Sequence, residues 1–106
     1  MINQSPTQEN TDPEDEGQHY VLQLFVTGIS LNSVRAIANI KQICEQYLPG
    51  KYSLEIIDVH QQKTLAEREQ LIALPLLIKR LPLPERRLIG DLSDTKKVLS
   101  GLGIIN

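Results

Sequence analysis

The stretch LIALPLLIKRLPLPERRLIGDLSD, residues 71–94, contains two apolar runs of strand length, LLIK and RRLIG. Prolines stand at the edges of both runs, at Pro75, Pro82 and Pro84. Proline has no N–H to donate to a ladder and favours extended geometry in the residue before it. It is therefore found at strand ends and edges rather than in central strands. The stretch predicts two short strands whose ends are marked by proline.

Toward the N-terminus, the sequence predicts a strand, a helix and a second strand. HYVLQLFVTG (residues 19–28) alternates as a strand does, and YSLEIIDVH (residues 52–60) is rich in β-branched residues. Between them, residues 31–48 predict a helix that Ser30 or Asn32 can cap and that Pro-Gly ends. Strand, helix and strand form a βαβ unit, so the two strands should be parallel. The apolar stripe of the helix is expected to comprise Val34, Ile37, Ile40, Cys44, Tyr47 and Leu48.

Two further helices flank the proline-edged strands. TLAEREQLIAL (residues 64–74) predicts a short helix before them, and SDTKKVLSGLG (residues 93–103) predicts one after them. Ser93 is the expected N-cap of the last helix, and Gly101 or Gly103 can end it. The predicted fold class is α/β, with the element order β-α-β-α-β-β-α.

Length and composition are those of one small globular domain. The chain has 106 residues, of which 41% are hydrophobic. It has no apolar run near the length that spans a bilayer and no basic-then-apolar N-terminus typical of a secretory signal. A single cysteine excludes a disulfide framework and fits a reducing compartment. We therefore expect a cytoplasmic protein.

Charge divides the chain into two parts. Residues 1–18 contain five acids and no Lys or Arg, which leaves eight acids and eleven bases from residue 19 onward. The segment 1–18 has few large apolar residues to offset its ordering entropy, so we expect a disordered acidic tail before a domain at residues 19–106. The mild basic excess of that domain is too small for a nucleic-acid footprint.

No motif predicts catalysis, a cofactor or a metal. Walker loops, dinucleotide fingerprints and nucleophile elbows are absent from the sequence. His19 and His60 lack the spacing to other ligands that a metal site needs. Cys44 lies on the apolar stripe of the first predicted helix, where a buried, inert thiol is expected.

Candidate contact residues are mainly basic. Arg86 and Arg87, with Lys79 and Arg80 nearby, form the densest basic cluster, for which a solvated strand edge is the simpler interpretation. Arg35 lies on the polar face of the first predicted helix. Asp58 ends the second predicted strand, where a cap or an ion pair is expected rather than an acid catalyst.

The predicted element order is similar to that of thioredoxin. In that fold a cis-proline precedes the third strand, and Leu74-Pro75 occupies this place. The redox cysteines of a thioredoxin would lie in the turn after the first strand, but here that turn reads TGISLNS and contains no cysteine. The strings LFVTG, NSVRAI, IIDV, LPLPERRLIGDLSD and KVLSGLG instead resemble the KaiB family of circadian-clock proteins, over residues 20–104.

The KaiB resemblance implies a binding protein without catalysis. Its expected partners are a KaiC-like hexameric ATPase and a KaiA-like protein. It implies a homo-oligomer, a dimer or tetramer, in a ground state ordered β-α-β-β-α-α-β, and an alternative thioredoxin-like monomer. In this interpretation Pro75, Pro82 and Pro84 reduce the preference for one strand pairing, so that two packings lie close in free energy. The simpler alternative is protection of edge strands against aggregation.

Two positions depart from the family pattern. Gly101-Leu102-Gly103 replaces an ending of the GLD type, a site tied to fold preference, and Glu55 stands where a lysine is expected. These departures leave open a stress-response adaptor that has changed partners. A thiol or glutathione-dependent enzyme, using Ser30 near Pro75 without a CxxC motif, is the remaining alternative.

Overall fold

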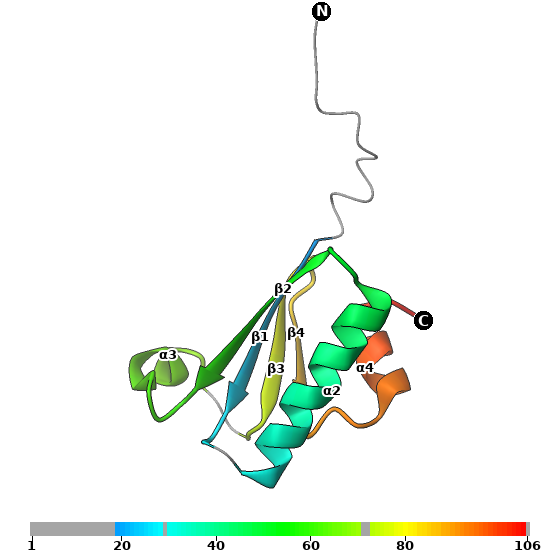
Figure 1. Cartoon of the computed structure of the whole chain (residues 1–106). Coiled ribbons are helices and arrows are strands. Elements are labelled where there is room, and N and C mark those ends of the chain that lie inside the picture. The colour runs from blue at the N-terminus through cyan, green and yellow to red at the C-terminus, as the bar shows by residue number, and fades with distance from the viewer. Residues whose placement is uncertain (1–18, 29, 71–72, 106) are drawn as a thin grey trace, which may run out of the picture.

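The computed structural model describes residues 19–28, 30–70 and 73–105 (Figure 1). The acidic segment 1–18 lies outside the described residues, so the predicted division at residue 19 stays a prediction. The elements follow the order predicted from the sequence, which is the thioredoxin-like of the two arrangements considered. They are β1 (Tyr20–Val26), α2 (Leu31–Tyr47), β2 (Tyr52–Asp58), α3 (Lys63–Arg68), β3 (Leu76–Leu81), β4 (Arg86–Ile89) and α4 (Thr95–Leu102).

The four strands form one mixed sheet in the order β2-β1-β3-β4. β1 and β2 are parallel, as the βαβ pattern predicted, and Tyr20 stands opposite Tyr52. β3 runs antiparallel to both β1 and β4. The sheet leaves one edge of β2 and one edge of β4 without a neighbouring strand.

The helices cover the two faces of the sheet unequally. Figure 1 shows α2 and α4 on one side and the short α3 on the other. The larger core lies under α2 and α4 and contains Leu22, Leu24 and Ile40. The smaller core, under α3, consists of Phe25, Ile57, Leu76 and Ile78. None of the described helices is long and apolar enough to cross a membrane.

The buried side of α2 differs from the predicted stripe. Val34 and Tyr47 are 49% and 39% exposed, whereas Ser33 is fully buried. A polar residue can be buried when its hydrogen bonds are made. The Ser33 hydroxyl accepts from Thr27 N at 3.2 Å and from Ser30 Oγ at 2.9 Å. The predicted stripe is confirmed at Ile40, Cys44 and Leu48, which are buried, and was wrong at Val34 and Tyr47. The burial of Ser33 was missed because apolar spacing alone does not show these hydrogen bonds.

The ends of the helices are set by short polar residues and glycine. Ser30 caps α2, as one of the two predicted candidates. Asp94 caps α4 by accepting from Lys97 N, so the prediction of Ser93 as the cap was wrong. Ser93 N instead donates to Asp91 Oδ1. Gly103 ends α4 with φ +80°, a left-handed conformation. Glycine adopts it at the lowest cost because it has no side chain.

The prolines mark the limits of the C-terminal strands, as predicted. Pro75 directly precedes β3, Pro82 directly follows it, and Pro84 lies two residues before β4. The three Leu–Pro peptide bonds at these prolines are cis. The thioredoxin resemblance implied a cis bond at one of them, Leu74–Pro75.

Candidate partner-binding surface

The face of the sheet that carries α3 is polar beyond the smaller core. Gln23 on β1 stands opposite Glu55 on β2 in the parallel register. Gln23 Nε2 donates to Glu55 Oε1 at 3.0 Å. Side chains opposite each other on one face are the closest neighbours in a sheet, so this bond follows from the register.

Arg80 extends the polar contacts from β1 to β3. Val21 and Leu22 on β1 pair with Leu81 and Lys79, so Arg80 is the extra residue of a β-bulge. A bulge redirects a side chain. Arg80 Nε donates to Gln23 Oε1 at 2.7 Å, and its guanidinium also pairs with Glu69 and Glu85, both at 2.5 Å.

Glu69 holds two arginines from neighbouring strands. It caps the C-terminal end of α3, and its side chain is only 15% exposed. One carboxylate oxygen pairs with Arg80, and the other pairs with Arg87 on β4 at 3.1 Å. Arg87 also donates to the Glu69 carbonyl at 3.2 Å. We call the connected set Glu55, Gln23, Arg80, Glu85, Glu69 and Arg87 the polar row.

The charges of the polar row stabilise one another. Burial opposes the charged form of Arg80, but its hydrogen bonds to Glu69 and Glu85 outweigh that effect and raise the pKa of Arg80 above its ordinary value. Bonds between an ionised donor and an ionised acceptor are stronger than neutral ones and fix geometry. The row therefore presents a fixed pattern of charge across four strands.

The predicted basic cluster is divided between the two faces of the sheet. Arg87 and Arg80 belong to the polar row, and Arg86 is exposed on β4. Lys79 is 4% exposed on the opposite face, where its Nζ donates to the carbonyl of Leu102 at 3.3 Å. Neighbouring residues of a strand point to opposite faces, so Lys79 does not share the surface of Arg80. Its burial is contrary to a solvated edge and leaves it inaccessible for the predicted partner contact in this arrangement.

Arg35 lies near a different segment, the loop between β4 and α4. Hydrogen bonds from Ser93 lower the pKa of Asp91 in this loop, and the charge of Arg35 lowers it further. Asn39, also on α2, donates to the Asp91 carbonyl at 2.8 Å. Arg35 is thus separate from the polar row.

Asp58 has the capping role that the simpler interpretation predicted. Its Oδ1 accepts from His60 N at 2.8 Å in the turn after β2. His60 Nε2 is 2.9 Å from Thr27 Oγ1, so this side chain contacts a hydroxyl rather than further metal ligands. Among the described residues there is no group of three or more His, Cys, Asp or Glu that could hold a metal ion.

The place of the redox cysteines is taken by two serines. Ser30 and Ser33 stand at the start of α2 with a C-x-x-C spacing, and Ser30 Oγ donates to Ser33 Oγ. A hydroxyl cannot form the disulfide on which thiol exchange depends. Cys44 lies in the core, where burial, with a smaller effect of Glu45, raises the pKa of the thiol to about 12. The thiolate is the reactive form of cysteine, so Cys44 does not replace the missing nucleophile.

Sequence reasoning missed Gln23, Glu69 and Glu85 as members of the surface. Gln23 was visible as the one polar residue inside an apolar strand, and Glu85 as an acid between Pro84 and Arg86. Glu69 gave no comparable signal, because its contacts depend on where α3 ends relative to β3 and β4.

Together, the fold and the serine pair define a thioredoxin-like α/β protein that lacks the redox cysteines. The Drosophila melanogaster thioredoxin Deadhead matches with a TM-score of 0.67 and 16% identity, over 88% of this chain and 87% of that one. The N-terminal domain of Synechococcus elongatus SasA matches with a TM-score of 0.67 and 27% identity, over 92% and 96%. The KaiB domain model matches residues 23–104. The chain belongs to the KaiB family.

Two curated relatives show how far this likeness extends. The circadian clock protein KaiB3 of Synechocystis sp. is 52% identical over 80% of this chain and 83% of its own length. The circadian clock oscillator protein KaiB of Synechococcus elongatus is 50% identical over 81% and 84%. Membership in this family of clock regulatory proteins confirms both the resemblance read from the sequence and the prediction that the chain is not an enzyme.

Proposed function

We propose that the chain is a non-enzymatic regulatory protein of the KaiB type that associates with a KaiC-like hexameric ATPase in circadian timing. About 50% identity to clock proteins over the folded part supports the regulatory role. The observation that carries the binding role is the ordered charged surface on the LPLPERRLIGDLSD stretch and its neighbours, where Arg87 is held by Glu69. An arginine that is already held in place loses less side-chain entropy on binding.

The proposed contact is formed by Arg87 together with Arg86. Arg86 is exposed and makes no ion pair with any residue the structure describes. Arg86 and Arg87 point to opposite faces of β4, the edge strand, so an acidic partner that met both would enclose this edge. Opposite charges across such an interface steer association and set specificity. Arg35 would form a separate contact beside the β4–α4 loop, and Asp58 another after β2. Lys79 is left out because it is buried.

The partner surface should differ from that of a KaiB with a lysine at position 55. Glu55 is exposed at the other end of the polar row, where it accepts from Gln23. An acidic patch that suits Arg87 would be repelled by Glu55 if it extended along the polar row. This charge order supports a partner with divided charge. We propose a derived regulatory or stress pathway as the second setting in which such a changed partner would act.

The assembly states are part of the same proposal. We infer a homo-oligomer, a dimer or tetramer, whose subunits take the order β-α-β-β-α-α-β and differ from the thioredoxin-like arrangement in their C-terminal half, and a KaiA-like protein as a further partner in the cytoplasm. Gly103 supports a role of the α4 end in choosing between states. A Cβ at this glycine would lie 3.7 Å from Lys79 Nζ, so an acid there would meet the buried ammonium. Gly101 and the prolines at positions 75, 82 and 84 are the other proposed determinants.

The test is capture of the KaiC-like ATPase encoded in the same genome. We expect the wild-type chain to bind it, and the double variant Arg86→Glu, Arg87→Glu to bind at least tenfold more weakly, because like charges in a desolvated contact are costly. Lys41→Glu, an exposed charge reversal on α2, is the matched control and should bind as the wild type does.

Three readouts separate binding from folding. Calorimetric titration gives the affinity, circular dichroism the helical content and light scattering the oligomer mass, each at low and high salt. Equal affinities of the double variant and Lys41→Glu would remove the arginines from the proposed surface. Absence of binding by the wild type would favour the changed-partner alternative over a KaiC-like ATPase.

A further inference from the structure

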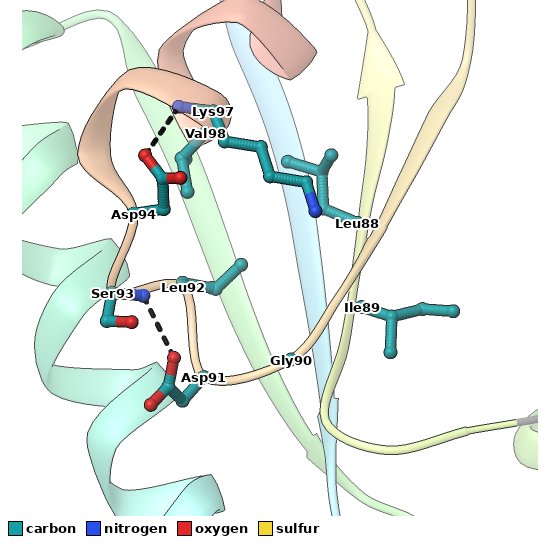
Figure 2. Close-up of a pocket in the computed structure, with 9 residues that line it drawn as sticks. All are labelled: Leu88, Ile89, Gly90, Asp91, Leu92, Ser93, Asp94, Lys97 and Val98. Atoms are coloured by element: carbon teal, nitrogen blue, oxygen red, sulfur yellow. Dashed lines mark hydrogen bonds between the residues drawn. The ribbon is translucent and has the colours of Figure 1, made fainter.

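A cavity lies between the end of β4, the loop of residues 90–94 and the first turns of α4 (Figure 2). Its volume is about 180 Å³, and Leu88, Leu92 and Val98 supply apolar wall. An apolar cavity of about 150 Å³ engineered in another protein stays dry and binds benzene. This cavity therefore has room for an apolar group of about six carbons.

The cavity has one cation at its rim that is not neutralised. Figure 2 shows the side chain of Lys97 reaching across to Leu88. Its ammonium makes no hydrogen bond or ion pair with any described residue. The carboxylates of Asp91 and Asp94 lie on the other side of the view and are engaged, since Asp91 accepts from Ser93 N at 3.0 Å and Asp94 from Lys97 N at 3.1 Å.

The two acids are also offset by nearby positive charge. Arg35 on α2 lowers the pKa of Asp91 and so favours its charged form. Asp94 stands at the N-terminal end of α4, where the helix dipole favours an anion. The ammonium of Lys97 is thus the charged group at the rim that an anionic ligand can still neutralise.

The rim is held in place before any ligand binds. Asn39 on α2 donates to the Asp91 carbonyl, and Gly90 N donates to the Pro75 carbonyl at 3.0 Å. Leu92 is buried with φ +62°, a conformation that bulky side chains rarely adopt. Such residues persist where their surroundings determine them, and they cluster at functional sites. Small-ligand sites are usually preformed and combine apolar wall with a few placed polar groups. This cavity combines the apolar side chains with a polar side formed by Asp91, Ser93, Asp94 and Lys97.

We propose that this cavity binds an apolar carboxylate of about six carbons, with the carboxylate at the ammonium of Lys97 and the apolar group among Leu88, Leu92 and Val98. The site lies on the α2 and α4 side of the sheet, away from the polar row, and does not depend on the proposed association with an ATPase. The same chemistry is offered by a free short-chain acid and by the C-terminal leucine of another chain.

The experiment is a titration of the full chain, labelled with ¹⁵N, with sodium hexanoate, followed by NMR. We expect saturable shifts at residues 88–98, with hexanoate binding about fivefold more tightly than hexan-1-ol, because the ion pair is at an exposed rim. Hexylamine should bind most weakly. N-acetylleucine identifies the source, since tighter binding than hexanoate indicates the end of a chain and weaker binding a free acid.

Lys97→Gln supplies the decisive comparison. It should remove the advantage of hexanoate over hexan-1-ol and leave the binding of hexan-1-ol unchanged. Lys96→Gln, on the same helix but not on the cavity, should keep that advantage. The proposal is overturned by shifts that do not saturate, by equal binding of hexanoate and hexan-1-ol to the wild type, or by identical behaviour of the two variants.

Discussion

Lys79 is held in the core by the end of a helix. Its ammonium donates to the carbonyl of Leu102 in the last turn of α4, and helix C-termini carry partial negative charge. Burial lowers the pKa of Lys79, and the nearby charge of Arg86 lowers it further. Keeping this charge inside the folded protein therefore costs free energy. The unfolded chain does not have this cost, because its lysine is hydrated.

We expect Lys79→Met to raise the free energy of unfolding at pH 7 by about 1 kcal/mol, because an apolar side chain of similar size needs no hydration. The advantage should shrink as the pH rises from the folded-state pKa toward 10.5, the unfolded value. In that interval the unfolded wild type binds a proton that the folded wild type has released, so wild-type stability rises with pH. Urea denaturation at pH 7 and pH 10 measures both effects.

The control for this prediction is Lys96→Met, an exposed substitution on α4. It should change the free energy of unfolding by less than about 0.5 kcal/mol at either pH. A clear loss of stability in Lys79→Met at pH 7 would contradict the prediction and show that the bond to Leu102 outweighs the cost of burial.

Gln23 shows which features of the structure can be predicted from the sequence and which cannot. Gln23 could be assigned to a strand because the strand period of two is visible in seven letters. Its bonds to Glu55 and Arg80 could not, because they depend on a register and on a bulge that sequence spacing does not encode. The site was therefore predicted as a basic stretch, while the acids that organise it were missed.

Among the elements, α2 depends most visibly on its first turn. Ser30 caps the helix by accepting from Ser33 N at 3.2 Å, and its hydroxyl also donates to the buried Ser33 hydroxyl. Ser33 in turn accepts from Thr27 N at the end of β1. This chain of bonds joins the end of β1, the first strand of the βαβ unit, to the helix that covers it.

We expect Ser30→Ala to lower the free energy of unfolding by about 1 kcal/mol, which is the usual value of a helix N-cap. Asn32→Ala, in the same turn but exposed, should change it by less than about 0.5 kcal/mol. Thermal and urea denaturation of the two variants provide the comparison. Equal losses would mean that the cap contributes nothing beyond local helix propensity.

Element order was predicted correctly because strand period, helix period and proline position agree along this chain. The order alone did not select between the two arrangements that the KaiB resemblance implied. Packing adds what the order lacks: Leu88 lies so close to Gly101 that a Cβ on the glycine would be 2.5 Å from Leu88 Cδ2. Contacts of this kind are not visible in a list of elements.

At the scale of the whole molecule, the sheet separates two surfaces. The polar row lies on the face with α3, and the cavity at Lys97 lies on the face with α2 and α4. A protein partner on the first face and a small acid on the second would not compete for the same residues. Within the part of the chain that the structure describes, the sheet and both cores draw on residues 20–104.

We therefore expect deletion of residues 1–18 to leave the melting temperature within about 2 °C of the wild type, since no strand or helix of the described fold is lost. The deletion removes five acids and no base, which changes the formal net charge from −2 to +3. Calorimetry measures the first effect and ion-exchange retention at pH 7 the second. A fall of several degrees would show that residues 1–18 contact the domain.

The serine pair at the start of α2 has a consequence for cell physiology. Proteins with two cysteines at such a position change their state whenever the balance of oxidants changes. Here the hydroxyls of Ser30 and Ser33 are inert to that balance, and the single thiol is shielded in the core. A protein built in this way would keep the same covalent state at this position whether its surroundings were oxidising or reducing.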